Sequence, residues 1–151
     1  MPMIANGWGL YYFRIFKASL DELEAAVTQL AQDDPRGYKT HPKTKLLASV
    51  YKTITDVVPD NPDAPDVRLG KTLGLNNTNW RRVEKSMPDR YRLFFRFASG
   101  PVKVVLYVWF NDEDTMRNAG SKTDVYAAFN RMLKRGAVPA RTSDLIAGSR
   151  G

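Results

Sequence analysis

The segment Arg90–Phe97, which reads RYRLFFRF, alternates between two sets of side chains and constrains the fold more than any other part of the chain. Successive side chains of an extended strand point to opposite faces. One face would be apolar and consists of Tyr91, Leu93, Phe95 and Phe97. The other would carry Arg90, Arg92, Phe94 and Arg96. Guanidinium groups suit phosphate because they donate paired hydrogen bonds and keep their charge. The pattern therefore predicts a strand with one face on a core and the other on a nucleic acid.

Two further segments with strand character flank this one and are joined to it by short turns. They are Trp80–Lys85 and Val102–Phe110, and the turns are Ser86–Asp89 and Ala98–Pro101. This spacing predicts a three-stranded antiparallel meander. Centring the turns places Arg92 between Arg82 and Tyr107, Arg90 between Glu84 and Trp109, and Arg96 opposite Lys103. The apolar face would receive two helices and comprises Leu93, Phe95, Phe97, Val102, Val104, Leu106, Val108 and Phe110.

The N-terminal part of the chain predicts one strand and one helix before the meander. The aromatic segment Trp8–Phe16 is typical of a strand. Ser19 and Glu22 have the spacing of a capping box, and apolar residues follow them at helical intervals. The helix that they begin is expected to end at Asp33–Gly37.

Two more helices are predicted, one before the meander in the sequence and one after it. Pro42 suits a first helical turn, and Pro59 stops the long apolar stripe that follows it. Ser121 and Asp124 are spaced as a capping pair for a last helix, which ends at Gly136. The order is therefore β-α-α-β-β-β-α in an α+β fold, with two N-terminal helices on one face of an antiparallel sheet.

Length and apolar content indicate one soluble domain, which we place at residues 1–139, with a tail at residues 140–151. No helix or strand is predicted after residue 137. No apolar run is long enough to cross a membrane, and the N-terminus lacks the pattern of a secretory signal.

Positive charge is concentrated in one part of the chain. The net charge is +7, and residues 81–103 hold seven Lys and Arg residues against two acidic ones. This clustering is typical of nucleic-acid binders, although a general contribution to solubility is the simpler alternative. Cysteine is absent and His41 is the one histidine, so thiolate metal sites and a histidine acid–base pair are excluded. His41 itself is expected to be a helix-start residue.

Several short segments, taken in order, resemble the YhaV family of type II toxin–antitoxin toxins, within the RelE/ParE superfamily. They run from residue 6 to about residue 139 and comprise Asn6–Trp8, Thr44–Ala48, Trp80 with Arg82–Val83, Arg90–Arg96, Asn111–Glu113 with Thr115 and Arg117, Lys122–Tyr126, Phe129, Met132–Gly136 and Pro139. Each is weak alone, and their order along nearly the whole chain makes the resemblance specific.

The resemblance implies a RelE-like fold and a cytoplasmic bacterial ribonuclease, an mRNA interferase that inhibits translation and growth. Cleavage in this superfamily needs no metal or other cofactor. The RNA 2′-hydroxyl attacks the adjacent phosphate and leaves a 2′,3′-cyclic phosphate, and many members cut mRNA on the ribosome. The implied partner is a cognate PrlF-type antitoxin with an AbrB-like DNA-binding domain, and the pair usually represses its own operon.

Such a reaction needs cations at the phosphate, a group that takes a proton and a group that orients the nucleotide. Arg82 and Arg92 are the expected transition-state stabilisers, since two neighbouring arginines repel unless an anion lies between them. Candidates for the acid or base are Glu84, Asp112, Glu113 and Lys122, with Glu113 ahead. The resemblance implies that Tyr126 orients the substrate, and helix packing is its alternative role.

Other basic or polar side chains are expected to contact RNA without taking part in the chemistry. They are Lys85, Arg90, Arg96, Lys103, Asn111, Arg117 and Lys134. For Asn111 and its neighbours a simple turn is the alternative, because Asn and Asp favour turns. Tyr107 and Trp109 would either stack on bases or pack under the last helix.

Two other functions remain open from the sequence. A sheet with basic and aromatic side chains also describes a non-catalytic nucleic-acid binder, although such platforms place aromatic rather than arginine side chains at the centre. ParE-type relatives inhibit DNA gyrase instead of cutting RNA. If the chain is a toxin of this family, we expect an acidic segment of the antitoxin to cover the region of Arg82 and Arg92.

Overall fold

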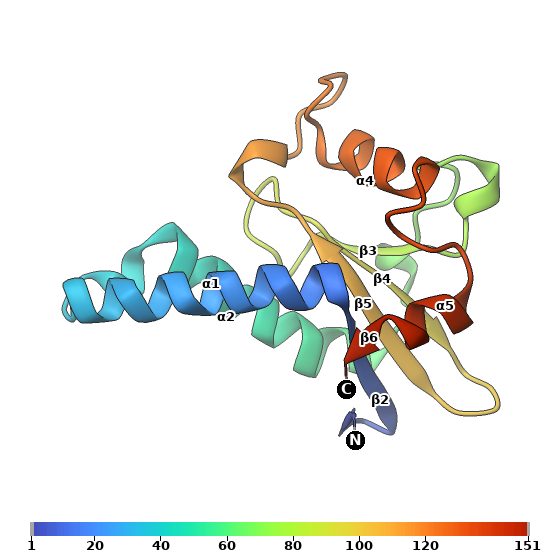
Figure 1. Ribbon diagram of the computed structural model, residues 1–151, viewed down its shortest axis with the longest axis horizontal. Helices are drawn as coiled ribbons and strands as arrows, with labels where there is room; N and C mark the ends of the chain where they lie inside the picture. The colour runs from blue at the N-terminus through green and yellow to red at the C-terminus, as the bar shows by residue number, and fades with distance from the viewer. Residues whose placement is uncertain (1, 151) are drawn as a thin grey trace.

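The structure, a computed structural model that describes residues 2–150, has a six-stranded sheet with helices on both faces (Figure 1). The strands are β1 Met3–Ala5, β2 Trp8–Phe13, β3 Arg81–Val83, β4 Leu93–Ala98, β5 Val104–Phe110 and β6 Ser149–Arg150. The helices are α1 Arg14–Asp33, α2 Pro42–Lys52, α3 Val58–Asp60, α4 Val125–Lys134 and α5 Thr142–Ala147. The α+β class and the order β-α-α-β-β-β-α are confirmed, with β1, α3, α5 and β6 as additions.

The sheet is mixed rather than antiparallel throughout. Its strands follow the order β1-β2-β5-β4-β3, and β6 pairs with β2. Strands β3, β4 and β5 form the predicted antiparallel meander, whereas β2 pairs with β5 in parallel. The chain enters the meander in the direction of β2 and reverses twice, so its last strand lies beside β2 and points the same way.

The predicted register between β3 and β4 is wrong by two residues. Arg82 pairs with Phe94 and not with Arg92. Arg92 precedes the first residue of β4, because Arg90 has a left-handed backbone with φ of 70° that turns the chain away from the ladder. A shift of two residues keeps each side chain on its predicted face of β3 and β4.

The register between β4 and β5 changes along the pair. Phe94 pairs with Trp109, and after a β-bulge Phe95 pairs with Tyr107. A bulge adds one residue to one strand and so reverses the face of the side chains beyond it. Three residues of β5 that were expected beside Phe95 therefore lie on the opposite face, with Phe94: Val104, Leu106 and Val108.

Both faces of the sheet are buried. Helices α1 and α2 cover one face, as predicted, through residues such as Phe16, Leu23 and Val50. Helix α4 covers the other, where the ring of Phe129 stacks on that of Phe94 with 4.3 Å between the ring centroids. Burying one such ring stabilises the fold by about 1.5–3 kcal/mol. The face that was expected to meet nucleic acid is therefore occupied at its centre by the protein itself, and Trp109 packs there.

Helix α1 begins at Arg14, five residues before the predicted capping box. Phe16 is fully buried and continues the stripe of Leu20, Leu23 and Val27 by one turn, so it belongs to the helix rather than to the preceding strand. Ser19 consequently lies inside the helix. The capping-box spacing also occurs in helix interiors, which explains the wrong start.

The second helical region begins at Pro42, as predicted. His41 is its N-cap, because Nδ1 accepts a hydrogen bond from the backbone N–H of Lys43 at 3.1 Å. After α2 the chain continues through a π-helical segment, Thr53–Val57, into the short α3. The predicted helix-start role of His41 is confirmed.

The segment after residue 137 is structured, contrary to the expectation of a tail without elements. Leu145 on α5 is fully buried in the apolar cluster on the α4 side of the sheet, and α5 contacts β2 and β6. Residues 149 and 150 then pair with β2. A helix of six residues with a single buried residue gives too weak a periodic signal to be detected in the sequence. Within residues 2–150, no helix is both long and apolar enough to cross a lipid bilayer.

Tyr107 ties the sheet to the π-helical segment, and we expect Tyr107→Phe to reduce the free energy of unfolding by about 1–3 kcal/mol. The hydroxyl donates a hydrogen bond to the carbonyl of Ile54 at 2.8 Å, and burial raises the pKa of Tyr107 well above 10. Pro59, five residues beyond Ile54, has no N–H that could replace this donor.

Urea denaturation of the wild type and the variant measures this effect. Tyr11→Phe removes a hydroxyl from a half-buried residue of β2 and serves as the control, with an expected change within about 0.5 kcal/mol. Equal stability of Tyr107→Phe and wild type would contradict the role assigned to this hydrogen bond.

Candidate active site

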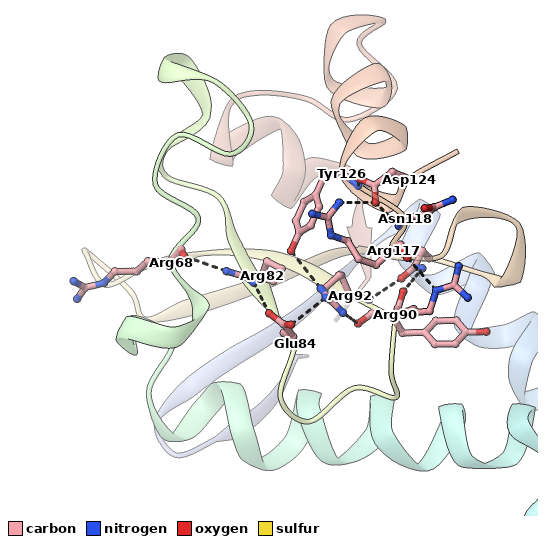
Figure 2. Close-up of polar contacts among 11 residues, drawn as sticks. Arg68, Arg82, Glu84, Arg90, Arg92, Arg117, Asn118, Asp124 and Tyr126 are labelled. Carbon is pink, nitrogen blue, oxygen red and sulfur yellow. Dashed lines mark hydrogen bonds and ion pairs between the residues drawn. The ribbon is translucent and has the colours of Figure 1, made fainter. Parts of the chain in front are cut away.

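The carboxylate of Glu84 lies between the guanidinium groups of Arg82 and Arg92 (Figure 2). Glu84 Oε2 accepts a hydrogen bond from Arg82 Nη1 at 2.8 Å, and Oε1 accepts one from Arg92 Nη2 at 3.0 Å. Arg82 comes from β3, Glu84 follows this strand, and Arg92 precedes β4. The two arginines, called the arginine pair below, are thus brought together through a side-chain anion rather than through opposite positions in the ladder.

Arg92 is almost fully buried and is held by three groups besides Glu84. Its Nη1 donates to the carbonyl of Tyr91 at 2.9 Å, and its Nε donates to the hydroxyl of Tyr126 at 3.3 Å. Its backbone N–H donates to Asn111 Oδ1 at 2.7 Å. These contacts fix the direction of the guanidinium before any ligand arrives.

Arg82 is held from the other side of Glu84. Its Nη2 donates to the backbone carbonyl of Arg68 at 3.3 Å, and its side chain is 16% exposed. Arg82 Nε is buried and has no hydrogen-bond partner among the residues that the structure describes. The guanidinium is therefore fixed in place without being saturated by protein acceptors.

Asn111 lies beneath this site and not on its surface. It is fully buried, and its Nδ2 donates to the carbonyls of Thr115 at 2.9 Å and Arg90 at 3.3 Å. Together with the bond from the Arg92 backbone, these contacts join the end of β5 to the chain that enters β4. Direct contact of Asn111 with RNA, as expected from the sequence, does not fit this burial, and the residue positions Arg92 instead.

The start of α4 brings Tyr126 to the arginine pair. Asp124 caps the helix, since Oδ2 accepts from the backbone N–H of Tyr126 at 3.1 Å. Asp124 Oδ1 accepts from Arg117 Nη1 and from the Asn118 backbone, both at 2.7 Å. The Arg117 guanidinium lies 4.9 Å from the centroid of the Tyr126 ring. Arg90 Nε in turn donates to the Arg117 carbonyl at 3.0 Å, so two expected RNA contacts join the same cluster.

Asp124 makes the stability of this region depend on pH. Burial raises the pKa of Asp124, but the hydrogen bonds from Arg117, Asn118 and Tyr126 outweigh it and leave the pKa below the ordinary value of 3.8. The stability that the carboxylate contributes is therefore present above pH 3.8 and is lost as the pH falls through the lower folded value.

Asp124→Asn should consequently destabilise the protein at pH 7 by about 1–3 kcal/mol, and the difference from wild type should shrink below about pH 4. Urea denaturation at pH 7 and pH 3 measures both effects. Asp56→Asn, at an exposed position of the π-helical segment, controls for the loss of one negative charge. A difference between Asp124→Asn and wild type that stays constant with pH would contradict this account.

Three of the four predicted acid or base candidates do not meet the arginine pair, and Asp112 is one of them, since its side chain contacts Asp114 and Thr115. Glu113 is exposed and lines a cavity of about 310 Å³ between α1, α2 and the end of β5. The pKa of Tyr91, in the same cavity, is raised by burial and then by the charges of Glu113 and Asp112. Lys122 is exposed in the loop before α4. Among the described residues, no hydrogen bond or ion pair joins Glu113 or Lys122 to the arginine pair.

The remaining predicted RNA contacts are spread over the molecule. Lys85 is exposed near the site and forms an ion pair with Asp66 at 3.6 Å. Arg96 pairs with Leu106 rather than Lys103, and its guanidinium lies 5.2 Å from the centroid of the Trp80 ring. It donates to the carbonyl of Ala140, and burial lowers its pKa.

Lys103 and Lys134 lie on other parts of the surface. The Lys103 ammonium is 4.7 Å from the centroid of the Trp8 ring, beside the turn between β1 and β2. Lys134 is exposed at the C-terminal end of α4, away from the turn that carries Tyr126.

Two contributors to the site were missed by the sequence analysis. Asp124 was identified only as a helix cap, yet it also holds Arg117. Arg68 contributes a backbone carbonyl, for which a sequence carries no signal. Glu84 was named as a candidate base, whereas its place between two arginines follows only from the observed register.

The cluster is suited to bind a phosphate group and to stabilise added negative charge on it. Two oriented guanidinium groups face one anion, and a tyrosine hydroxyl lies beside one of them. Preorganised donors of this kind stabilise a charged transition state because they need little reorganisation during the reaction.

Comparison with known proteins agrees with this chemistry. The YhaV toxin family model, described as a toxin with endonuclease activity of a toxin–antitoxin system, matches residues 10–150. The chain is 46% identical over 140 residues to ribonuclease toxin YhaV of Escherichia coli strain K12, covering 92% of this chain and 90% of that protein. Toxin YhaV from E. coli O157:H7 and from E. coli O6:H1 show the same identity and coverage. No solved structure matches the chain significantly.

Proposed function

The chain belongs to the YhaV family of toxins with endonuclease activity from toxin–antitoxin systems, and from this premise we propose that it is an endoribonuclease that cleaves mRNA. Cleavage of mRNA in the cytoplasm would inhibit translation and growth. The observation that carries the proposal is the arginine pair, which already holds an anionic group between its two guanidinium groups.

In the proposed reaction the RNA 2′-hydroxyl loses its proton, and its oxygen forms a bond to the adjacent phosphorus. The bond from phosphorus to the 5′-oxygen breaks, and this oxygen takes up a proton. The products are a 2′,3′-cyclic phosphate and a 5′-hydroxyl. Arg82 and Arg92 would stabilise the charge that develops on the phosphate, without a metal ion. Tyr126, whose hydroxyl contacts Arg92, would orient the phosphate at the same point.

A cognate antitoxin of the PrlF type, with an AbrB-like DNA-binding domain, would neutralise this activity. We propose that one of its acidic segments covers the arginine pair. The contact with Glu84 supports this, because it demonstrates that a carboxylate fits between the two guanidinium groups. Binding of operator DNA would then be a property of the antitoxin complex.

Cleavage of end-labelled RNA by the purified protein in EDTA, with and without ribosomes, tests the proposal. The expected products carry cyclic-phosphate ends, and Arg82→Ala should reduce the rate by about a hundredfold or more. Cleavage only with ribosomes would locate the reaction on the translating mRNA. No cleavage by folded, antitoxin-free protein, together with inhibition of gyrase supercoiling, would replace the proposal with a ParE-like activity.

A further inference from the structure

The place of Glu84 suggests a role that catalysis alone does not require. Resting on the function proposed above, we infer that the Glu84 carboxylate occupies the phosphate subsite of the free enzyme and is displaced when the scissile phosphate enters. Glu84 would thus be an intramolecular competitor of the substrate. Its effect would be to lower the affinity of the site for RNA.

The side chains of the arginine pair are held more firmly than the side chain of Glu84. The side chains of Arg82 and Arg92 are 16% and 10% exposed, whereas that of Glu84 is 50% exposed. The arginines have other acceptors in the carbonyls of Arg68 and Tyr91 and the hydroxyl of Tyr126. The hydrogen bonds of the Glu84 carboxylate within residues 2–150 go only to the arginine pair. Rotation of Glu84 into solvent would therefore leave both arginines anchored.

The Glu84 contacts also leave the arginine pair able to bind a better anion. Each guanidinium donates a single hydrogen bond to the carboxylate, so neither forms the two-bond fork that makes such pairs strong. Partly exposed ion pairs of this kind contribute little to stability, because solvent screens them. A phosphodiester presents two non-bridging oxygens and one negative charge, as a carboxylate does, but its pentavalent transition state carries an additional negative charge. The charge that develops in the transition state therefore favours replacement of Glu84 by the phosphate.

The test measures binding and turnover in Glu84→Gln and Glu84→Ala at fixed ionic strength. The binding probe is a 2′-O-methyl RNA oligonucleotide, which cannot be cleaved because the attacking hydroxyl is blocked. Both variants are expected to bind it about twofold to tenfold more tightly than wild type, and inorganic phosphate should compete more effectively. The kcat/KM for cleavage of unmodified RNA should rise by a similar factor, through a lower KM.

A matched control separates local competition from a change in net charge. Glu22→Gln makes the same substitution at an exposed position of α1 and should leave the affinity at the wild-type value. Equal affinities in wild type and both Glu84 variants, with thermal melting confirming the fold, would overturn the inference. A fall in kcat of tenfold or more would overturn it too and identify Glu84 as the general base. A wild type that binds the oligonucleotide but does not cleave RNA would refute the proposed function alone.

Discussion

Replacing Arg92 by lysine is expected to lower the kcat for RNA cleavage by about a hundredfold to a thousandfold and to leave the protein folded. The substitution keeps the positive charge but removes the planar fork. In the structure the three guanidinium nitrogens make three separate contacts, with Tyr91, Tyr126 and Glu84. A lysine ammonium is a single point charge and cannot reproduce these directions. The effect should therefore appear in the chemical step rather than in RNA binding.

Single-turnover cleavage with saturating enzyme measures this step, and the KM from steady-state rates reports on binding. Arg36→Lys is the matched control, because Arg36 is exposed in the loop between α1 and α2. It should retain the wild-type rate. If Arg92→Lys cleaved RNA within threefold of the wild-type rate, charge alone would explain the role of Arg92, and the geometric argument would be wrong.

Asn111→Ala should cause the largest loss of stability among the single changes considered, about 3 kcal/mol or more. The substitution leaves the buried Arg92 backbone N–H and the part-buried Thr115 carbonyl without their partner, whereas the Arg90 carbonyl keeps its hydrogen bond from the Arg117 backbone N–H. Each unsatisfied group costs about 1–3 kcal/mol. Asn111→Asp should also destabilise, since a carboxylate accepts from Arg92 but cannot donate to the two carbonyls.

Urea denaturation measures the free energy of unfolding of both Asn111 variants. Asn79→Ala, at an exposed position before β3, is the control and should change it by less than about 0.5 kcal/mol. Cleavage assays on the fraction that remains folded test the effect on the site, because the backbone N–H of Arg92 loses its hydrogen-bond acceptor. A stability of Asn111→Ala within 1 kcal/mol of wild type would show that the buried groups find other partners.

The meander was predictable because alternation over eight residues is a strong signal, and its turns are short. Its register was not, because two causes lie outside any local pattern. The left-handed backbone of Arg90 turns the chain out of the ladder before β4, and a bulge after Phe94 shifts the rest of β4 against β5. The start of α1 was misplaced because Phe16 satisfies both a strand and a helix pattern.

The site was predictable in its residue types more than in its geometry. Arg82, Arg92 and Tyr126 do meet, but Glu84 and Asp124 hold them together through contacts between elements distant in sequence. Basic residues chosen mainly for their charge, such as Lys103 and Lys134, lie on separate parts of the surface. Charge clustering in a sequence does not establish that the side chains share one surface.

The stacking of Phe129 on Phe94 has a consequence for the chemistry above it. Tyr126 lies one turn before Phe129 on α4, and Arg92 lies two residues before Phe94 on the other side of the stack. The thickness of this aromatic layer sets the height of the helix over the strand, and with it the separation of the tyrosine hydroxyl from the guanidinium. Two hydrocarbon rings thus act as the spacer that sets the distance between the Tyr126 hydroxyl and the Arg92 guanidinium.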